Sequence, residues 1–247
     1  MRGSFFFILI FSVISNAAHS EDLIKINSGD GVEISADLYK VHPDSVPFII
    51  LFHQAGWSRG EYLETAPKLN VLGYNCLAVD LRSGKHVNGI DNKTVVSANR
   101  ALKETNYIDA YQDIEATVLH VKEFLTKGKI IIIGSSFSSS LVLKYAGEYP
   151  ENVDGVIAFS PGEYFGSSGK PNDFIQSSAK NIRCPSFITS ARSEKKSWLS
   201  IYKSIEMDTK SYYLPETSGN HGSKALWQKF TDHKDYWNAM TEFLLKI

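Results

Sequence analysis

Residues 129–146, KIIIIGSSFSSSLVLKYA, constrain the fold of this chain more than any other stretch. A continuous run of isoleucines is typical of a strand that is buried on both faces of a sheet. The run ends at Gly134, a sharp turn around Ser136 follows, and the pattern over residues 138–148 predicts a helix. Such a turn strains the backbone at its serine and needs small neighbours two positions away, which here are Gly134 and Ser138. This arrangement is typical of a nucleophile elbow, and a serine-rich loop that only caps the helix is the alternative.

Strand and helix patterns alternate along the rest of the chain, which predicts a mostly parallel sheet covered by helices on both faces. The expected strands, about eight, are residues 22–28, 32–41, 47–53, 74–80, 129–134, 153–160, 184–190 and 209–215. The first two alternate in polarity around Gly29-Asp30-Gly31, which predicts an antiparallel hairpin at one edge of the sheet. The expected helices are residues 60–72, 107–126, 138–148, 195–205 and 223–245. Because no linker or repeat divides residues 21–247, we expect a single α/β domain.

The first twenty residues have the pattern of a cleavable signal peptide. Arg2 is followed by an apolar run over residues 5–14, and Ala18-His19-Ser20 ends in the small-x-small pattern of a cleavage site. An uncleaved anchor is the alternative, but the apolar run falls short of the roughly 20 residues that span a bilayer. We therefore expect a secreted or periplasmic protein that starts near Glu21 and has no stable membrane insertion.

Composition narrows the possible partners. The chain has 26 Lys and Arg against 27 Asp and Glu, so no global field would attract nucleic acid or anionic lipid. A small neutral or mildly polar substrate fits this balance better. The histidines and carboxylates show no metal-ligand spacing such as H-E-x-x-H, so no cofactor is expected. The two cysteines, Cys76 and Cys184, fall in separate strand candidates, and we expect buried free thiols rather than a disulfide.

A serine nucleophile needs a base that follows it in the chain, and His221 is the best candidate. His221 lies in ETSGNHGSKALW, between the last strand candidate and the last helix candidate, so its imidazole can reach the turn at Ser136. His120 and His233 fall within predicted helices instead. A surface histidine with no role is the alternative interpretation of His221.

The third member of a triad should be a carboxylate after the strand at residues 184–190, where the chain reads SARSEKKSW. Glu194 is the only carboxylate in that loop, and Glu163, after the preceding strand, is the second choice. Glu194 could instead belong to a solvated charged turn with Arg192 and Lys195.

Backbone N–H groups are expected to bind the developing oxyanion. One is that of Phe137, directly after the predicted nucleophile. The second should come from the loop after residues 47–53, where Gln54 and Ala55 are both able to donate because the donor is the backbone. A loop that only connects a strand to a helix is the alternative.

These features together resemble the α/β-hydrolase superfamily, and within it the compact dienelactone hydrolase-like and cinnamoyl or feruloyl esterase-like members. The resemblance covers nearly all of residues 21–247 and rests on the loop at His53, on LGYNCLAVDLRSG, on the GSSFS turn and on HGSKAL. It implies that the N–H of Ala55, rather than that of Gln54, is the second oxyanion donor. It also implies that Asp80 braces the loops.

The resemblance implies a serine hydrolase that cleaves an ester-like bond in a small molecule through Ser136, His221 and Glu194. The chain departs from the family pattern at Gln54, at Ser138 and in the position of the acid, one residue later than usual. A peptidase, a thioesterase, an acyltransferase or a catalytically silent binding module on the same fold remain open. Residues 161–183 are too few for a lid domain, and Trp57, Tyr164, Phe165 and Trp198 are either pocket walls or ordinary packing.

Overall fold

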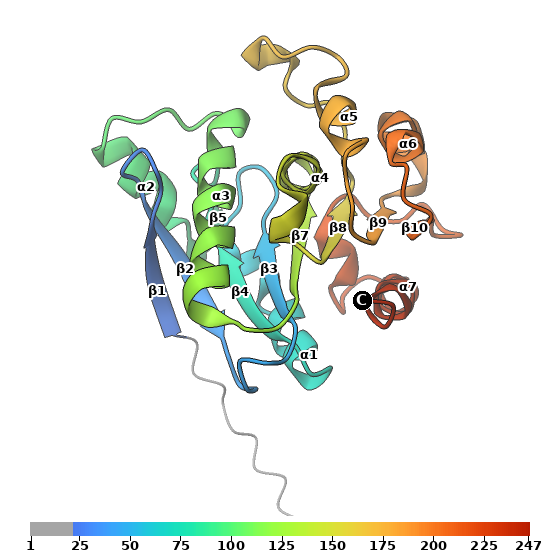
Figure 1. Ribbon diagram of the computed structural model, residues 1–247, viewed down its shortest axis with the longest axis horizontal. Helices are drawn as coiled ribbons and strands as arrows, with labels where there is room; N and C mark the ends of the chain where they lie inside the picture. Colours follow the sequence, from blue (N-terminus) through green and yellow to red (C-terminus); the bar gives the residue numbers. More distant parts are fainter. Residues whose placement is uncertain (1–21) are drawn as a thin grey trace, which may run out of the picture.

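The computed structural model describes residues 22–247, so the predicted signal peptide lies outside the described residues. Eight strands form one sheet in the order β1-β2-β4-β3-β7-β8-β9-β10 (Figure 1). β2 is antiparallel to β1 and β4, and every other neighbouring pair is parallel. The strands are β1 (Asp22–Asn27), β2 (Glu33–Tyr39), β3 (Phe48–Phe52), β4 (Asn75–Val79), β7 (Ile130–Ser135), β8 (Gly155–Phe159), β9 (Ser186–Thr189) and β10 (Lys210–Tyr213). The predicted sheet and its edge hairpin are confirmed.

Successive residues of the central strands pack against different helices, as the pleat of a strand requires. Ile130 and Ile132 of β7 belong to one buried cluster, whereas Ile131 and Ile133 belong to the other. The first cluster includes side chains of α3 (Tyr111–His120), α4 (Phe137–Glu148), α5 (Phe174–Ala179) and α6 (Lys195–Ser204). The second includes side chains of α1 (Thr65–Val71) and α7 (His233–Leu244) (Figure 1). Helices therefore cover both faces of the sheet. This burial explains why the sequences of the central strands are continuous apolar runs.

Two helix predictions need correction. The helix predicted over residues 60–72 is a 3₁₀ turn, Arg59–Tyr62, followed by α1. The helix predicted over residues 223–245 is a 3₁₀ turn, Ser223–Leu226, and then α7, because Trp227 takes an extended backbone, with φ −72° and ψ 137°, that ends the first turn. The Trp227 indole donates to the carbonyl of Glu61 at 2.8 Å, which favours this conformation over a helical one.

Residues 82–106 fold into more structure than the sequence indicated. They contain a two-stranded ribbon of β5 (His86–Val87) and β6 (Ile90–Asp91), followed by α2 (Lys93–Arg100). Asp80, at the end of β4, accepts hydrogen bonds from the Arg59 and Lys93 amides at 2.8 and 2.7 Å. The Arg59 guanidinium also contacts Asp80 at 2.8 Å. Asp80 therefore ties the loop after β3 to this segment, as the resemblance implied.

The connection from β8 to β9 is short. Residues 161–183 hold the 3₁₀ turn Gly166–Ser168 and α5, and no separate lid domain occurs within residues 22–247. No helix in this range is long and apolar enough to cross a bilayer.

Cys76 lies on β4 and Cys184 precedes β9, and β3, β7 and β8 separate these two strands in the sheet. Both thiols are buried and free, which confirms the prediction.

Candidate active site

Ser136 sits at the strained turn between β7 and α4. Its φ of 58° and ψ of −122° lie outside the regions that side-chain-bearing residues favour. Its amide donates to the carbonyl of Phe159 on the neighbouring strand at 2.7 Å, which helps to hold the turn in place. Ser138, where the family pattern has glycine, accepts from the Ser135 amide at 2.9 Å and donates to the Phe52 carbonyl at 2.8 Å. The substitution therefore links the turn to the end of β3.

Gly134 allows α4 to pass directly over β7. A methyl group at this position would lie 2.5 Å from the Cα and amide nitrogen of Ser139, which are backbone atoms that cannot rotate away. We expect Gly134→Ala to lower the free energy of unfolding by about 1–3 kcal/mol, the usual cost of overpacking. Urea denaturation measures this effect, with Gly166→Ala as the control because nothing lies within 4 Å of the added methyl there. Equal unfolding free energies for the two variants would contradict this account of Gly134.

The structure brings Ser136, His221 and Glu194 into one hydrogen-bonded chain. His221 Nε2 lies 2.8 Å from Ser136 Oγ, and His221 Nδ1 lies 2.6 Å from Glu194 Oε1. A carboxylate can only accept a hydrogen bond, so the proton of a neutral His221 is on Nδ1 and the lone pair of Nε2 faces the serine hydroxyl. All three side chains reach the carboxyl edge of the sheet from separate loops.

Glu194 ends a 3₁₀ turn, Arg192–Glu194, directly after β9. Its second oxygen, Oε2, accepts from Ser160 Oγ at 2.7 Å and from the Ala191 amide at 3.2 Å. Burial raises the pKa of Glu194, but the hydrogen bonds from His221 and Ser160 outweigh it, and the net pKa lies below its ordinary value. Glu194 therefore stays ionised while it faces the imidazole.

Glu163, the second choice for the acid, lies at the start of α5. Its carboxylate accepts from the amides of Ile175 and Gln176 at 2.8 and 2.9 Å, at the start of α5. It serves as a cap for that helix and makes no contact with His221.

The loop after β3 leaves one of its two candidate amides free. The Gln54 amide donates to Glu61 Oε2 at 2.7 Å, so it is not available to a ligand. Within residues 22–247, the amides of Ala55 and Phe137 have no protein acceptor. His53 holds the base of the loop, because its Nε2 accepts from the Leu81 amide at 2.8 Å. The geometry is thus compatible with Ala55, and not Gln54, as the second oxyanion donor.

Two hollows that share lining residues lie on this side of the molecule, and Ala55 lines the first of them. The first, of about 660 Å³, is lined by Ala55, Ser83, Lys85 and Tyr107, among others. The second, of about 690 Å³, shares Tyr107 and Thr105 with the first. The Tyr107 ring stacks on that of Phe137 with 4.7 Å between centroids, which places both hollows next to the elbow. Both hollows are open and have mixed polar and apolar linings.

The four aromatic residues named as possible pocket walls divide into two groups. Trp198 and Phe165 are buried in the core, and Trp57 stacks on Trp227 with 5.2 Å between ring centroids. Tyr164 donates to the Ser160 carbonyl at 2.7 Å and lies beside Ser136. Burial raises the pKa of Tyr164 to about 12, so its hydroxyl remains protonated. Only Tyr164 of the four lies at the triad.

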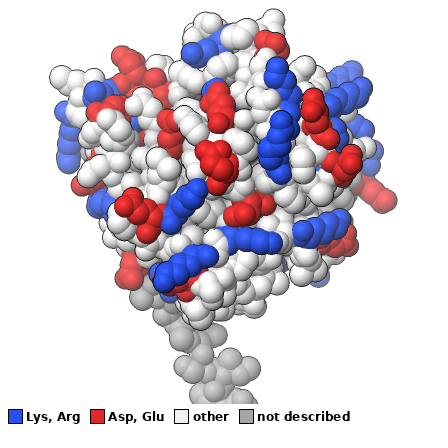
Figure 2. Space-filling view, viewed as in Figure 1, with Lys and Arg blue, Asp and Glu red and all other residues white. Residues whose placement is uncertain are grey.

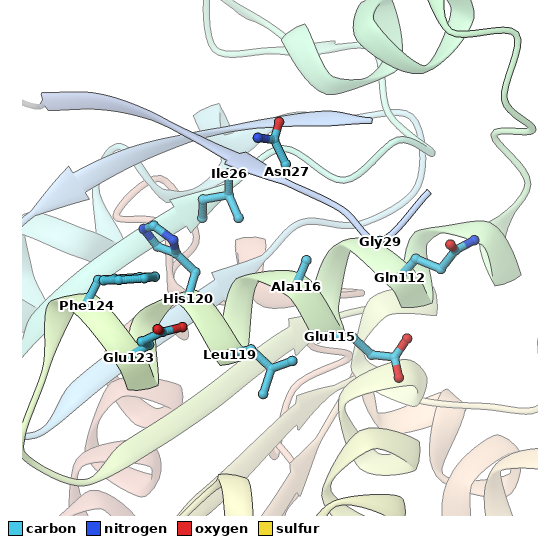
Figure 3. A pocket seen from close by; sticks show the side chains of 10 residues that line it. All are labelled: Ile26, Asn27, Gly29, Gln112, Glu115, Ala116, Leu119, His120, Glu123 and Phe124. Atoms are coloured by element: carbon cyan, nitrogen blue, oxygen red, sulfur yellow. The ribbon is translucent and has the colours of Figure 1, made fainter. Parts of the chain in front are cut away.

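A further hollow, of about 510 Å³, lies between β1 and the helical segment of residues 111–125, where Ile26 points toward the side of His120 and Phe124 (Figure 3). Its lining contains none of the residues predicted for the site. Figure 2 shows acidic and basic side chains interspersed over one face of the molecule, without a large area of one sign. The charge distribution on that face agrees with the expectation from composition.

Sequence reasoning missed two polar residues close to the hydrogen-bonded chain of Ser136, His221 and Glu194. Ser160 joins Glu194 to the His221 loop, because it also accepts from the Gly222 amide at 2.9 Å. Its place at the end of a buried strand was the available signal. Glu61, fully buried between three loops, was also missed. Its sequence position, in the predicted helix of residues 60–72, carries no signal for this burial.

The fold defines an α/β-hydrolase, with no lid domain among residues 22–247. The chain belongs to the family described as serine aminopeptidase, S33, which it matches over residues 44–183. No curated protein matches the sequence.

Solved structures of similar fold include two enzymes whose chains are almost fully matched. An esterase of Pyrococcus furiosus is 19% identical with a TM-score of 0.70, over 92% of this chain and 93% of the esterase. A dienelactone hydrolase of Anabaena variabilis is 14% identical with a TM-score of 0.71, over 92% of this chain and 97% of the hydrolase. At these identities the likeness shows the fold, which agrees with the resemblance stated above.

Proposed function

We propose that this protein is a serine hydrolase that cleaves a carboxylic ester bond in a small molecule. The observation that carries the proposal is the chain of hydrogen bonds from Ser136 through His221 to Glu194, with lengths of 2.8 and 2.6 Å. A serine hydroxyl is a weak nucleophile by itself, and a base with an oriented, available lone pair is what activates it.

In the proposed reaction, Ser136 Oγ attacks the ester carbonyl while His221 Nε2 takes the hydroxyl proton. Glu194 stabilises the imidazolium that forms and keeps its orientation. The imidazolium then gives its proton to the leaving alcohol, and an acyl-enzyme remains. Water attacks this ester in a second cycle, loses its proton to His221, and releases the carboxylic acid and free Ser136.

The amides of Ala55 and Phe137 are proposed to bind the oxyanion of each tetrahedral intermediate. Both are free in the described structure, and Phe137 is the first residue of α4, so the positive end of the helix dipole adds to the attraction. Loss of one such donor typically costs about 3–4 kcal/mol of transition-state stabilisation.

An aminopeptidase is the second candidate, because the family carries that description. An aminopeptidase must bind the positively charged α-amine of its substrate, and a carboxylate is the usual partner of such a charge. The two hollows beside the elbow, formed by described residues, have no carboxylate in their linings. Lys85 lines the first, and the guanidinium of Arg82, which also lines it, is already paired with Asp30 and Asp113. This lining favours a neutral or anionic ester over a peptide amine.

The test combines a fluorophosphonate probe with two chromogenic substrates, 4-nitrophenyl butyrate and alanine 4-nitroanilide. The wild-type protein should be labelled only when folded, and kcat/KM for the ester should exceed that for the anilide by about 100-fold or more, equivalent to about 2.7 kcal/mol. Faster cleavage of the anilide would replace the esterase proposal by a peptidase. A folded protein that takes up no probe and hydrolyses neither substrate would be a silent member of the fold.

A further inference from the structure

Glu61 is a buried carboxylate at the meeting point of three loops. It lies on the 3₁₀ turn Arg59–Tyr62, and its exposed fraction is 0%. Oε1 accepts from the hydroxyls of Ser135 and Ser223 at 2.7 and 2.6 Å. Oε2 accepts from the Gln54 amide at 2.7 Å. One side chain therefore contacts the residue before the proposed nucleophile, the loop of the proposed base and the loop of the proposed oxyanion donor.

The directions of these hydrogen bonds are fixed by their neighbours. The Ser223 amide donates to Ser135 Oγ at 2.9 Å, so the Ser135 hydroxyl is left to donate its own proton to Glu61. Ser223 thus binds Ser135 through its amide and Glu61 through its hydroxyl. This closed ring holds a residue two positions after His221 against a residue one position before Ser136.

The loops also meet with little free space. A Cβ on Gly222, between His221 and Ser223, would lie 2.6 Å from Ser135 Oγ and 3.0 Å from Gln54 Oε1. The Gly222 φ of 74° is a conformation that favours glycine. Small movements of one loop would therefore be transmitted to the other two.

The buried carboxyl group of Glu61 depends on the hydrogen bonds that it accepts. Burial raises the pKa of Glu61, and the hydrogen bonds from Ser223, Gln54 and Ser135 oppose that rise. A carboxyl group removed from water is costly unless it is hydrogen-bonded, so burial favours the one arrangement in which three donors converge on Glu61. Contacts of this kind can set geometry as well as stability.

We propose that Glu61 is a positioning residue for the proposed hydrolase, which aligns the Ser136 turn, the His221 loop and the Ala55 amide by accepting hydrogen bonds from all three loops. Glu61 touches no reacting atom. With the Gln54 amide engaged by Glu61, the next amide, that of Ala55, remains the free donor of that loop.

The inference rests on the proposed function and is tested by steady-state hydrolysis of 4-nitrophenyl butyrate. A misplacement of about 1 Å can cost about 100-fold in rate, so Glu61→Ala should lower kcat by about 100-fold. KM should change by less than threefold, because no substrate contact is lost. Glu61→Gln keeps the shape and can keep hydrogen bonds to rotated hydroxyls, so it should restore kcat to within about tenfold of wild type.

Glu64→Ala is the matched control. Glu64 is exposed, lies three residues along the same segment, and accepts a single bond from the Gln228 amide at 2.9 Å. Its removal should leave kcat within twofold of wild type. If Glu61→Ala unfolds, Ser135→Ala provides the second test, because it breaks the ring at one hydroxyl and should lower kcat by about tenfold, or 1.4 kcal/mol.

Four outcomes separate the inference from the proposed function. Wild-type protein without ester hydrolysis or probe labelling would remove the proposed function itself. An active wild type with a folded Glu61→Ala variant whose kcat is within threefold would overturn the role of Glu61 alone. The same holds for Ser135→Ala if its kcat stays within threefold, or for a fall in activity that appears only in KM.

Discussion

Ser136→Ala is expected to lower kcat for 4-nitrophenyl butyrate by about 10⁶-fold, the loss typical when the nucleophile of an acyl-transfer triad is removed. The reason is that His221 then has no hydroxyl to activate, and only the free amides at Ala55 and Phe137 remain to stabilise a direct attack by water. The variant should take up no fluorophosphonate, since that probe reacts with the serine oxygen. The measurements are single-turnover labelling and steady-state hydrolysis at equal protein concentration.

Ser177→Ala is the control for this experiment, because Ser177 is exposed on α5 and belongs to no part of the proposed machinery. It should label and turn over like the wild type. Full labelling of the Ser136→Ala protein would assign the nucleophile to another residue. A decrease in kcat of less than tenfold would do the same.

Glu194→Gln is expected to lower kcat by about 10⁴-fold, the loss seen when a triad carboxylate becomes an amide. The carboxylate now accepts from His221 Nδ1 at 2.6 Å, which leaves Nε2 free to take the serine proton. An amide NH₂ facing Nδ1 would favour the opposite tautomer, in which Nε2 carries the proton and cannot act as a base. Turning the amide around would place its NH₂ against the Ala191 amide, which also donates.

Glu163→Gln is the matched control for Glu194→Gln. Both glutamates follow strands of the sheet, and both accept backbone amides, but Glu163 caps α5 and does not reach His221. Its kcat should stay within twofold of wild type. A larger loss of kcat in Glu163→Gln than in Glu194→Gln would assign the role of the acid to Glu163, which would require His221 to lie elsewhere than it does here.

The fold could be predicted where a strand is buried on both faces, because the residues of such a strand are mostly apolar. Helices cover both faces of β7 and β3, so the isoleucines of β7 and residues Phe48–Phe52 of β3 form continuous apolar runs. Such runs predict buried strands from the sequence alone. Residues 223–245 show where this reasoning fails. Ala225, Leu226 and Trp227 are all buried, which favoured a helix, yet the backbone of Trp227 is extended. Its indole donates to the carbonyl of Glu61, a residue far away in sequence.

The candidate site residues could be chosen from the order of strands and loops along the chain, which the sequence pattern shows directly. Ser136, His221 and Glu194 each follow a strand candidate, and parallel strands end at the same edge. The late position of Glu194 is accommodated by the 3₁₀ turn Arg192–Glu194, which turns the carboxylate back toward His221. Neither that turn nor the burial of Glu61 has a local sequence signal, because both arise from contacts between loops that only the folded chain brings together.

The reactivity of the two buried cysteines can be used to measure local opening of the sheet. Within residues 22–247 no covalent cross-link holds β4 to β9, so folding does not depend on the thiol redox potential of the surroundings. Burial raises the pKa of Cys76 well above its ordinary value and that of Cys184 to about 12, so neither forms a thiolate while the sheet is closed. The rate at which an alkylating reagent consumes each thiol would therefore report local or global opening separately at β4 and at the start of β9.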